Sequence, residues 1–416
     1  MRNLLLSIVT LATLFVCSCE KGEDPTPTTP SEIPTIELKS NLQFCYLESG
    51  ATTAKLTFKV DDKWEIRFTT YEGEKVDWIK ANPVSGSAGV QNVEITLEPN
   101  REVDSRLVRA DILLKGNEVV RSEIDDILNT YQAVTLSASI LQFGYYNLKY
   151  GDPVKFKVTS TTRLQALVDE YIEKKGKKYS DLIYLDLDGP LNEVDFEFMH
   201  ENLNRLKVLD MFHADITEIP NRAFYGHSSL HYVLLPLSLK RIGSYAFCQT
   251  ELKNCNLFIP PLLEYVGSNA FADTYIGGSI VFPGTRSTIE LSVGAFYSEY
   301  IATAVFSDGI RVMKGDIVSP FYRLSAMRLP ASLQSISCGY IGDIDIIYCY
   351  PTIPPTTSDR YGLREGTIKA LFIPHTTNLL KDNLYVHKDE EDLTKDSHWL
   401  GFYSENPEFN KMHDVL

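Results

Sequence analysis

Two twelve-residue stretches, "PLSLKRIGSYAF" at 236–247 and "PPLLEYVGSNAF" at 260–271, decide the fold. Both carry Pro, Leu, a β-branched residue, Gly and an Ala-Phe pair at the same positions. Ala-Phe pairs also begin elsewhere, so that the series runs at intervals of 23 to 25 residues through Ala223, Ala246, Ala270 and Ala295. One such repeat cannot bury its own apolar side, so a period of this length predicts coils stacked into a solenoid.

A second marker keeps the same period. Short apolar runs end at Pro236, Pro260, Pro283 and Pro330, and Ser307 stands where a further Pro is expected. Each run is expected to be a strand that pairs with the equivalent strand of the next coil. Pro has no N–H to donate to the ladder, so it ends the strand and starts the turn.

The remaining repeated residues have expected places inside the coils. Gly243 and Gly267 suit tight turns. Ala suits a close approach between coils, and the Phe residues are expected to stack as a buried spine: Phe224, Phe247, Phe271 and Phe296, with Pro320-Phe321 in the next position. Pro351 and Pro374 continue the period.

The pattern P-x-x-L-x-x-I-G-x-x-A-F strongly resembles the BspA-like leucine-rich repeats, also called the Treponema pallidum type. Residues 236–247 and 260–271 match it without a gap, the third repeat is two residues longer, and the fourth lacks its Pro and Ala. The resemblance implies a mainly β chain with a leucine-rich-repeat solenoid over 216–374. Related repeat proteins are described as adhesins or binders of host proteins.

Residues 134–215 are expected to form a linker and a small α/β flank of the solenoid. "TTRLQALVDEYIEKKG" at 161–176 has the apolar spacing of a helix, with Thr161 or Thr162 as N-cap and Gly176 as C-cap. Residues 181–211 then read as strand, turn, short helix and strand, similar to the entry segment of such solenoids. Residues 375–416 are expected to cap the other end.

Residues 36–133 have the period-two alternation of a β-sandwich, in stretches such as "AKLTFKV" and "VEITLEP". The order of single residues is similar to the BACON family, a sandwich module of Bacteroidota surface proteins proposed to bind carbohydrate or mucin. The last strand is more polar than that family's usual ending. The matching residues are Trp64, Trp78, Ile79, Pro83, Gly86, Gly89, Asn100, Arg106 and Gln132.

The two tryptophans leave two interpretations open. An exposed Trp64 or Trp78 could stack on a sugar ring. Trp78 and Ile79 are adjacent and would point to opposite faces of a strand, so at least one of them is expected in the core. Under the alternative, both tryptophans are structural and the sandwich is a spacer.

The N-terminus resembles a bacterial lipoprotein signal peptide over residues 1–18. Arg2 precedes an apolar stretch, and Val16 and Ser18 precede Cys19 as a lipobox requires, so Cys19 is the expected lipidation site. The acidic and then Pro- and Thr-rich segment 19–35 is expected to be a tether. These features together predict an outer-membrane, lipid-anchored and surface-exposed protein.

The net charge and the absence of catalytic motifs narrow the range of possible functions. The net charge of −15 argues against binding to nucleic acid or to anionic lipid. No nucleophile elbow, P-loop, dinucleotide turn or zinc-protease helix occurs, so we expect no enzyme, no cofactor and no metal. The His- and acid-rich segment 387–398 is read as a solvated loop, and His227 and His231 are read as surface residues.

The cysteines do not indicate a disulfide framework. Five remain after the signal segment and Cys19, and none forms a CxxC motif. They are expected to be small core residues, although a disulfide is not excluded: Cys45, Cys248, Cys255, Cys338 and Cys349.

Three functions follow from this organisation. The preferred hypothesis is a surface lipoprotein that binds a host or bacterial protein through its solenoid, which a smooth polar ladder surface would favour. The second is capture of glycan or mucin beside a polysaccharide-uptake system, which exposed aromatic rows such as Tyr297, Tyr300 and Tyr322 would favour. The third is a structural component of the envelope.

Overall fold

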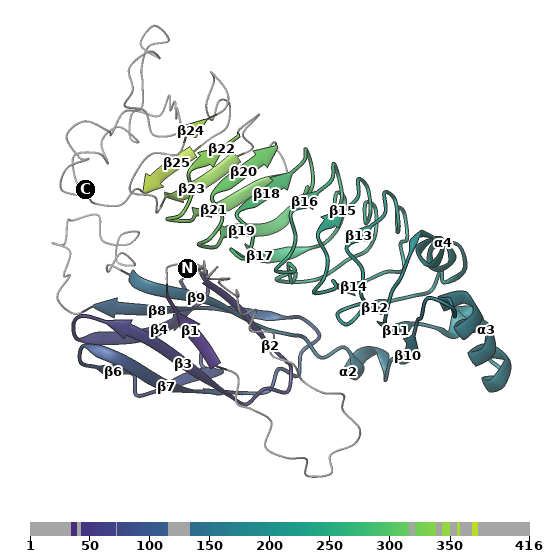
Figure 1. The fold of residues 1–416 in the computed structure, drawn as a ribbon, viewed down its shortest axis with the longest axis horizontal. Helices are drawn as coiled ribbons and strands as arrows, with labels where there is room; N and C mark the ends of the chain where they lie inside the picture. Colours follow the sequence, from purple (N-terminus) through teal and green to yellow (C-terminus); the bar gives the residue numbers. More distant parts are fainter. Residues whose placement is uncertain are drawn as a thin grey trace, which may run out of the picture.

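A computed structural model describes residues 35–39, 43–71, 73–114, 134–315, 321–337, 343–349, 356–357 and 368–372. The signal segment, the tether up to residue 34, the segment with Gln132 and the expected cap at 375–416 lie outside the described residues. Within them the chain is mainly β, and a sandwich precedes a solenoid of stacked coils (Figure 1). The fold class predicted from the repeats is confirmed.

The sandwich packs two sheets around an apolar core. One sheet has the order β1 (Thr35–Leu38), β3 (Thr53–Val60), β7 (Gly89–Leu97) and β5 (Ile79–Asn82). The other has the order β2 (Gln43–Leu47), β9 (Val134–Gln142), β8 (Arg106–Leu114), β4 (Trp64–Thr69) and β6 (Ser85–Gly86). Alternate side chains of the strands point inward, which is why the sequence alternates with period two. The core includes Leu56, Ile66, Ile95, Ile112 and Ile140.

The sandwich extends past the boundary expected at residue 133. Strand β9 pairs antiparallel with β8 and parallel with β2, so residues 134–142, expected as linker, form an interior strand of that sheet. Ala138 and Ile140 of β9 lie in the sandwich core. Strand β9 therefore belongs to the sandwich and not to the linker.

A small α/β unit leads from the sandwich into the coils. It consists of α2 (Asn147–Tyr150), β10 (Val154–Lys157), α3 (Leu164–Lys175), the 3-10 turn η1 (Tyr179–Asp181), β11 (Tyr184–Asp188), α4 (Glu193–Asn202) and β12 (Val208–Asp210). The order of strand, turn, helix and strand expected over 181–211 is therefore correct. Figure 1 shows α3 and α4 at the end of the solenoid where the coils begin.

Helix α3 is capped differently from the expectation. Gly176 ends it in the left-handed conformation (φ 61°), as predicted. At the other end the N-cap position is Arg163, not Thr161 or Thr162, and no side chain of its own segment caps it. Asp195 of α4 does so instead, because its carboxylate accepts from the Leu164 N–H at 3.1 Å.

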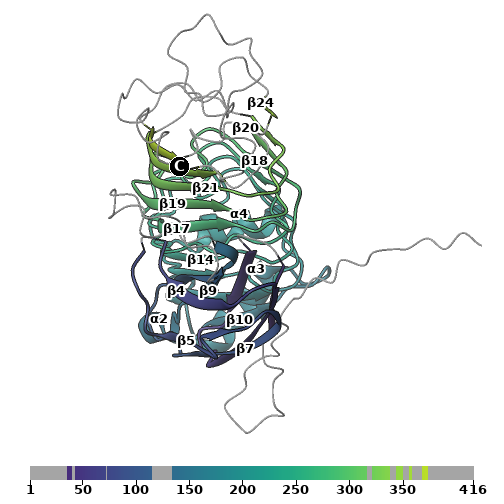
Figure 2. The ribbon, with the colours of Figure 1, turned by 90° about the vertical axis from the view of Figure 1, so that its left-hand side faces the viewer.

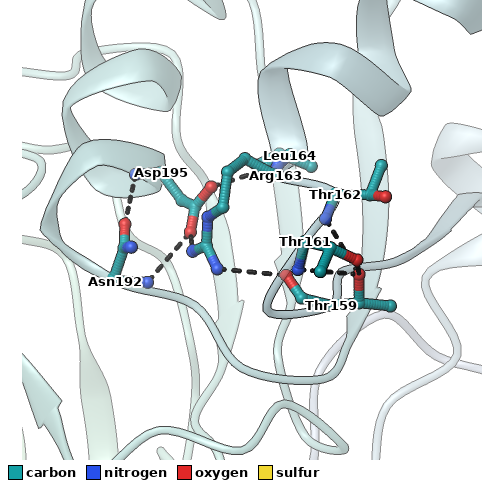
Figure 3. Close-up of polar contacts among 7 residues, drawn as sticks. All are labelled: Thr159, Thr161, Thr162, Arg163, Leu164, Asn192 and Asp195. Atoms are coloured by element: carbon teal, nitrogen blue, oxygen red, sulfur yellow. Dashed lines mark hydrogen bonds and ion pairs between the residues drawn. The ribbon is translucent and has the colours of Figure 1, made fainter.

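Asp195 joins the two helices of this unit (Figure 3). Its Oδ2 accepts from the Asn192 N–H at 2.9 Å, and the Asn192 side chain accepts in return from the Asp195 N–H, which closes a capping box at the start of α4. The buried carboxylate also forms an ion pair with Arg163. Burial of this charge is compensated by three donors, so the contact fixes how α3 and α4 meet.

The coils form two parallel sheets on opposite sides of the solenoid. The first sheet consists of β10, β11, β12 and β14 (Tyr232–Leu234) and, after a break, of β17 (Gly277–Phe282), β19 (Tyr300–Phe306), β21 (Arg323–Leu329), β23 (Asp343–Cys349) and β25 (Ile368–Phe372). The second consists of β13 (Glu218–Ile219), β15 (Arg241–Ile242), β16 (Tyr265–Val266), β18 (Thr288–Leu291), β20 (Val312–Gly315), β22 (Ser335–Ile336) and β24 (Thr356–Thr357). Figure 2 shows β19 and β21 on one side and β18 and β20 on the other.

The break in the first sheet falls on "NLFIP", which was expected to be a strand. Residues 256–260 form no strand. The side chain of Asn254 forms the hydrogen bonds to the preceding coil instead. Its side-chain Oδ1 accepts from the Val233 N–H at 3.2 Å and its Nδ2 donates to the Val233 carbonyl at 3.0 Å. An amide side chain thus replaces the backbone ladder for one coil.

The phenylalanine spine is confirmed. Phe224, Phe247, Phe271 and Phe296 are fully buried and stack in sequence, with ring centroids 5.1 to 5.4 Å apart and planes within 13° of parallel. Phe321 continues the stack at 5.8 Å from Phe296. Each ring therefore covers the next, which is why a large aromatic residue recurs once per coil.

The two glycines of the repeat serve close packing rather than the turn conformation expected for them. Neither Gly243 nor Gly267 has a positive φ. A Cβ at Gly243 would lie 2.4 Å from the Asn221 backbone N, and one at Gly267 would lie 2.6 Å from the Ser244 N. Only glycine lets the backbones of adjacent coils approach this closely.

Candidate binding surface

The outward side of the first sheet is covered by the sandwich (Figure 1). Aromatic rings from the two domains interlock there. The Tyr46 ring lies 5.2 Å from Phe258, and the Phe143 ring lies 5.3 Å from both Phe212 and Phe258. One apolar cluster spans both domains, and its solenoid members come from successive coils: Tyr184, Val208, Phe212, Tyr232, Leu234, Phe258, Val281 and Val305.

Polar contacts add to this interface. Asn256 donates from Nδ2 to the Ser105 carbonyl at 3.0 Å. The buried Arg328 guanidinium of β21 lies 5.4 Å from the Tyr71 ring of the sandwich and 4.0 Å from the Tyr348 ring of the next coil. The sandwich thus covers the first side of the solenoid from β11 to β21, and the described strands of this stretch leave no ladder free for a ligand.

The second sheet carries a row of polar side chains on its outward side, here called the polar ladder. Its members pair in register from coil to coil: Glu218 with Arg241, Arg241 with Tyr265, Tyr265 with Glu290, and Glu290 with Lys314. Arg241 stacks on the neighbouring ring of Tyr265, 4.1 Å from its centroid. All five residues are exposed or half-buried, which leaves the row accessible.

A second accessible feature is the tyrosine edge, formed by segments that run from a strand of the second sheet towards the next strand of the first. Its six tyrosines are 36% to 53% exposed, and they meet in pairs. Tyr225 lies 6.3 Å from Tyr245, Tyr275 lies 5.5 Å from Tyr300, and Tyr297 lies 5.2 Å from Tyr322. Arg222 lies 5.8 Å from both rings of the first pair.

The predicted aromatic site residues therefore separate into two groups. Tyr297, Tyr300 and Tyr322 are exposed on the tyrosine edge, where a ligand can reach them. Trp64 is fully buried in the sandwich core, with its ring 4.9 Å from Phe58, so its assignment as a ligand contact is wrong. A Cβ at Gly86 would meet the Trp64 indole at 2.7 Å, which shows that glycine is needed to make room for this ring.

Trp78 is half-buried, and Arg106 covers one face of its ring. The Arg106 guanidinium lies 4.1 Å from its ring centroid, and the ring packs against the sandwich core. Arg106 also donates from Nε to Gln142 at 2.9 Å. These contacts give Trp78 and Arg106 a role in the structure of the sandwich, and the assignment of Trp78 as a ligand contact stays a prediction.

Of the two histidines expected at the surface, His227 is buried and His231 is half-buried. His227 is buried and its Nε2 lies 3.0 Å from the Leu203 carbonyl. His231 Nδ1 lies 3.1 Å from the Tyr150 hydroxyl, and burial lowers the pKa of His231 to about 4. Both rings contact residues of neighbouring segments. Nothing in the local sequence distinguishes these two positions from exposed ones.

One carboxylate beneath the sandwich has an unusual titration. Burial and the neighbouring Asp186 carboxylate raise the pKa of Asp210 to about 7. The Phe212 N–H donates to Asp210 Oδ1 at 3.0 Å, and Lys155 binds Asp186 at 2.9 Å. Lys155, Asp186 and Asp210 lie in register on β10, β11 and β12, beside the interface with the sandwich.

The described residues contain neither a candidate metal site nor a candidate membrane-spanning helix. Among the described residues no group of three or more His, Cys, Asp or Glu side chains could hold a metal ion, and residues 387–398 lie outside them. None of the described helices combines the length and apolarity of a transmembrane span. Cys45 and Cys248 form no disulfide, and burial raises the pKa of the Cys45 thiol to about 12.

The repeat region matches a known family model. Residues 196–341 match the BspA type leucine rich repeat region in six copies. A comparison with curated proteins finds no match. The chain therefore contains a leucine-rich-repeat domain of the BspA type, and such repeats suggest a role in binding proteins.

Proposed function

We propose that this chain is a lipid-anchored protein of the cell surface that binds a protein partner through the polar ladder of its solenoid. One observation carries the proposal. The sandwich covers the outward side of the first sheet, whereas the second sheet keeps its polar row accessible. A mixed row of charges around an Arg-stacked tyrosine has the composition of protein interfaces, in which Tyr and Arg contribute most of the binding energy.

The sequence at the N-terminus supports the location. An apolar segment followed by Val16, Ser18 and Cys19 suits lipidation at Cys19, and the acidic and then Pro- and Thr-rich segment after it suits a tether to the membrane. Growth with a radiolabelled fatty acid, followed by isolation of the protein, tests this point. We expect label in the wild type and none in Cys19→Ala, and protease treatment of intact cells would then report which side of the membrane the domains face.

The binding proposal is tested with purified protein from residue 20 onward. The chain is applied to an array of purified host and bacterial surface proteins, and each hit is measured by interferometry for wild type, Arg241→Glu and Arg205→Glu. Binding that Arg241→Glu weakens at least about tenfold, and that the matched exposed control Arg205→Glu leaves unchanged, supports the polar ladder. Hits that both variants bind as well as wild type would place recognition elsewhere.

The tyrosine edge favours a second candidate, the binding of glycan or mucin. Exposed aromatic faces suit the C–H-rich surfaces of sugar rings. The same protein is tested on immobilised polysaccharides and mucin glycans, together with Tyr300→Ala and the double variant Tyr297→Ala/Tyr322→Ala. Saturable binding that these changes abolish would favour glycan capture, and retention of that binding in Trp78→Ala would exclude the sandwich as its site.

A further inference from the structure

The charges of the polar ladder follow an order that is its own complement. Along the coils the row reads Glu218, Arg241, Tyr265, Glu290 and Lys314, which is negative, positive, neutral, negative and positive. Read in the opposite direction, every charge changes sign and the tyrosine stays at the centre. A second copy of the row, turned by 180° about an axis through Tyr265, therefore places opposite charges against each other.

The geometry of the row suits such a match. In-register pairing places neighbouring members one inter-strand spacing apart, about 4.8 Å, so two rows of the same sheet have the same repeat. None of the four charged members forms an ion pair within the described part of the chain. Their charges are thus available to a partner, in contrast to Glu264 and Arg286 nearby, which pair with each other at 3.3 Å.

We propose that the polar ladder binds a second copy of this chain in an antiparallel, two-fold arrangement. Glu218 then faces Lys314 of the other copy, Arg241 faces Glu290 of the other copy, and the two Tyr265 rings meet on the axis. Each unlike pair occurs twice, as a two-fold interface requires. The parallel arrangement is excluded by the same charges, because it would place each residue against its own like charge.

This inference rests on the proposed function, since it names the protein partner of the same surface. The sandwich lies on the opposite side of the solenoid and does not obstruct the approach of a second copy. Exposed ion pairs each change affinity only about two- to fivefold, so the association is weak for free molecules. Attachment to a membrane would raise the effective concentration into the millimolar range and favour pairing between neighbouring molecules.

The experiment measures the oligomeric state of the protein from residue 20 onward by sedimentation velocity, from about 1 µM to about 1 mM and at two salt concentrations. We expect a dimer that forms with rising concentration and weakens at high salt, because ions screen exposed charges. Arg241→Glu and Glu290→Arg should each weaken the dimer at least about tenfold, since each variant turns two attractive contacts into repulsive ones. The exposed control Arg205→Glu should dimerise as wild type does.

Mixing the two variants gives the sharpest test. In a heterodimer of Arg241→Glu with Glu290→Arg, every contact of the row again joins opposite charges, so the mixture should dimerise although neither variant does alone. A misfolded variant could not be rescued in this way. The double variant Arg241→Glu/Glu290→Arg should also form its own dimer.

Three results would overturn the inference: a monomer throughout the wild-type series, a dimer that both single variants retain, or a mixture that stays monomeric. These results are separate from a failure of the proposed function. If the wild type is monomeric but Arg241→Glu abolishes binding to a protein on the array, the ladder binds a different protein. If neither self-association nor array binding depends on Arg241, the ladder is not a recognition surface.

Discussion

Single residues in this chain act through contacts made far along the sequence. Asp195 caps its own helix α4 and also the N-terminus of α3, and Gly243 makes room for the backbone of the preceding coil. The role of Asp195 requires its carboxylate, and the role of Gly243 requires the absence of a Cβ. Substitutions that change only these groups therefore test both roles.

Asp195→Asn is expected to destabilise the protein by about 3 kcal/mol, because it leaves Arg163 without its buried partner and weakens the caps of two helices. The free energy of unfolding in urea measures the effect. Glu193→Gln, an exposed carboxylate in the first turn of the same helix, is the control and should change that free energy by less than about 0.5 kcal/mol. Equal effects of the two variants would contradict the role of Asp195.

Two glycine substitutions separate crowding from backbone conformation. Gly226 has a φ of 69° with open space around its missing Cβ, so Gly226→Ala should cost about 1 kcal/mol through conformation alone. Gly243→Ala forces two coils apart and should cost about 3 kcal/mol. Denaturant unfolding of both variants tests this order, and a larger loss in Gly226→Ala would contradict it.

At the scale of the elements, each coil is held by its neighbours. Short strands of two to four residues in the second sheet could not be stable alone, and the phenylalanine stack between the two sheets joins them. Loss of one ring in the middle of the stack should therefore affect the whole array.

Phe271→Ala is expected to destabilise the solenoid by about 4 kcal/mol, because it removes a fully buried ring that stacks on two others. Phe271→Leu keeps most of the volume and should cost less than half as much. Thermal unfolding followed by circular dichroism gives both values. The exposed neighbour change Tyr275→Ala should be close to neutral, and a similar loss there would mean that the edge rather than the spine holds the coils.

At the scale of the whole molecule, the sandwich and the first side of the solenoid share one apolar cluster. The two domains should therefore unfold in one cooperative transition. The variant Phe258→Asp places a charge between Tyr46 and Phe143 and should separate this transition into two in calorimetry. A single transition in that variant at unchanged temperature would show that the domains are not coupled through this cluster.

The titration of Asp210 adds a pH dependence to the same interface. Its pKa of about 7 in the folded protein lies above the unfolded value, so the folded state binds a proton more tightly. The stabilising contribution is complete below about pH 4 and is lost as the pH rises towards 7. Asp210→Asn should remove this loss and exceed wild type by on the order of 2 kcal/mol at pH 8, with no gain at pH 4, as measured by urea unfolding at both values. An increase in the free energy of unfolding that is the same at pH 4 and pH 8 would contradict this role of Asp210.

The sequence alone determines the solenoid. Its period, the prolines after the strands and the phenylalanine spine follow from contacts that each coil repeats with the next, and such contacts leave a periodic trace in the chain. Tyr297, Tyr300 and Tyr322 are exposed, as the interpretation of the repeats as coils allowed. The buried position of Trp64 could have been recognised in the sequence, because the alternation of "WEIRFT" places Trp64 on the same side of β4 as Ile66.

Only the tertiary structure decided which side of the solenoid is free. The apolar runs of the first sheet, such as "HYVLLP", lack alternation and so indicate a strand that is buried on both sides. They do not say what covers the outer side, because burial of apolar surface is non-directional and any apolar partner satisfies it. The sandwich fills that place through residues distant in sequence, such as Tyr46 and Phe143, and thereby leaves the polar ladder as the accessible sheet.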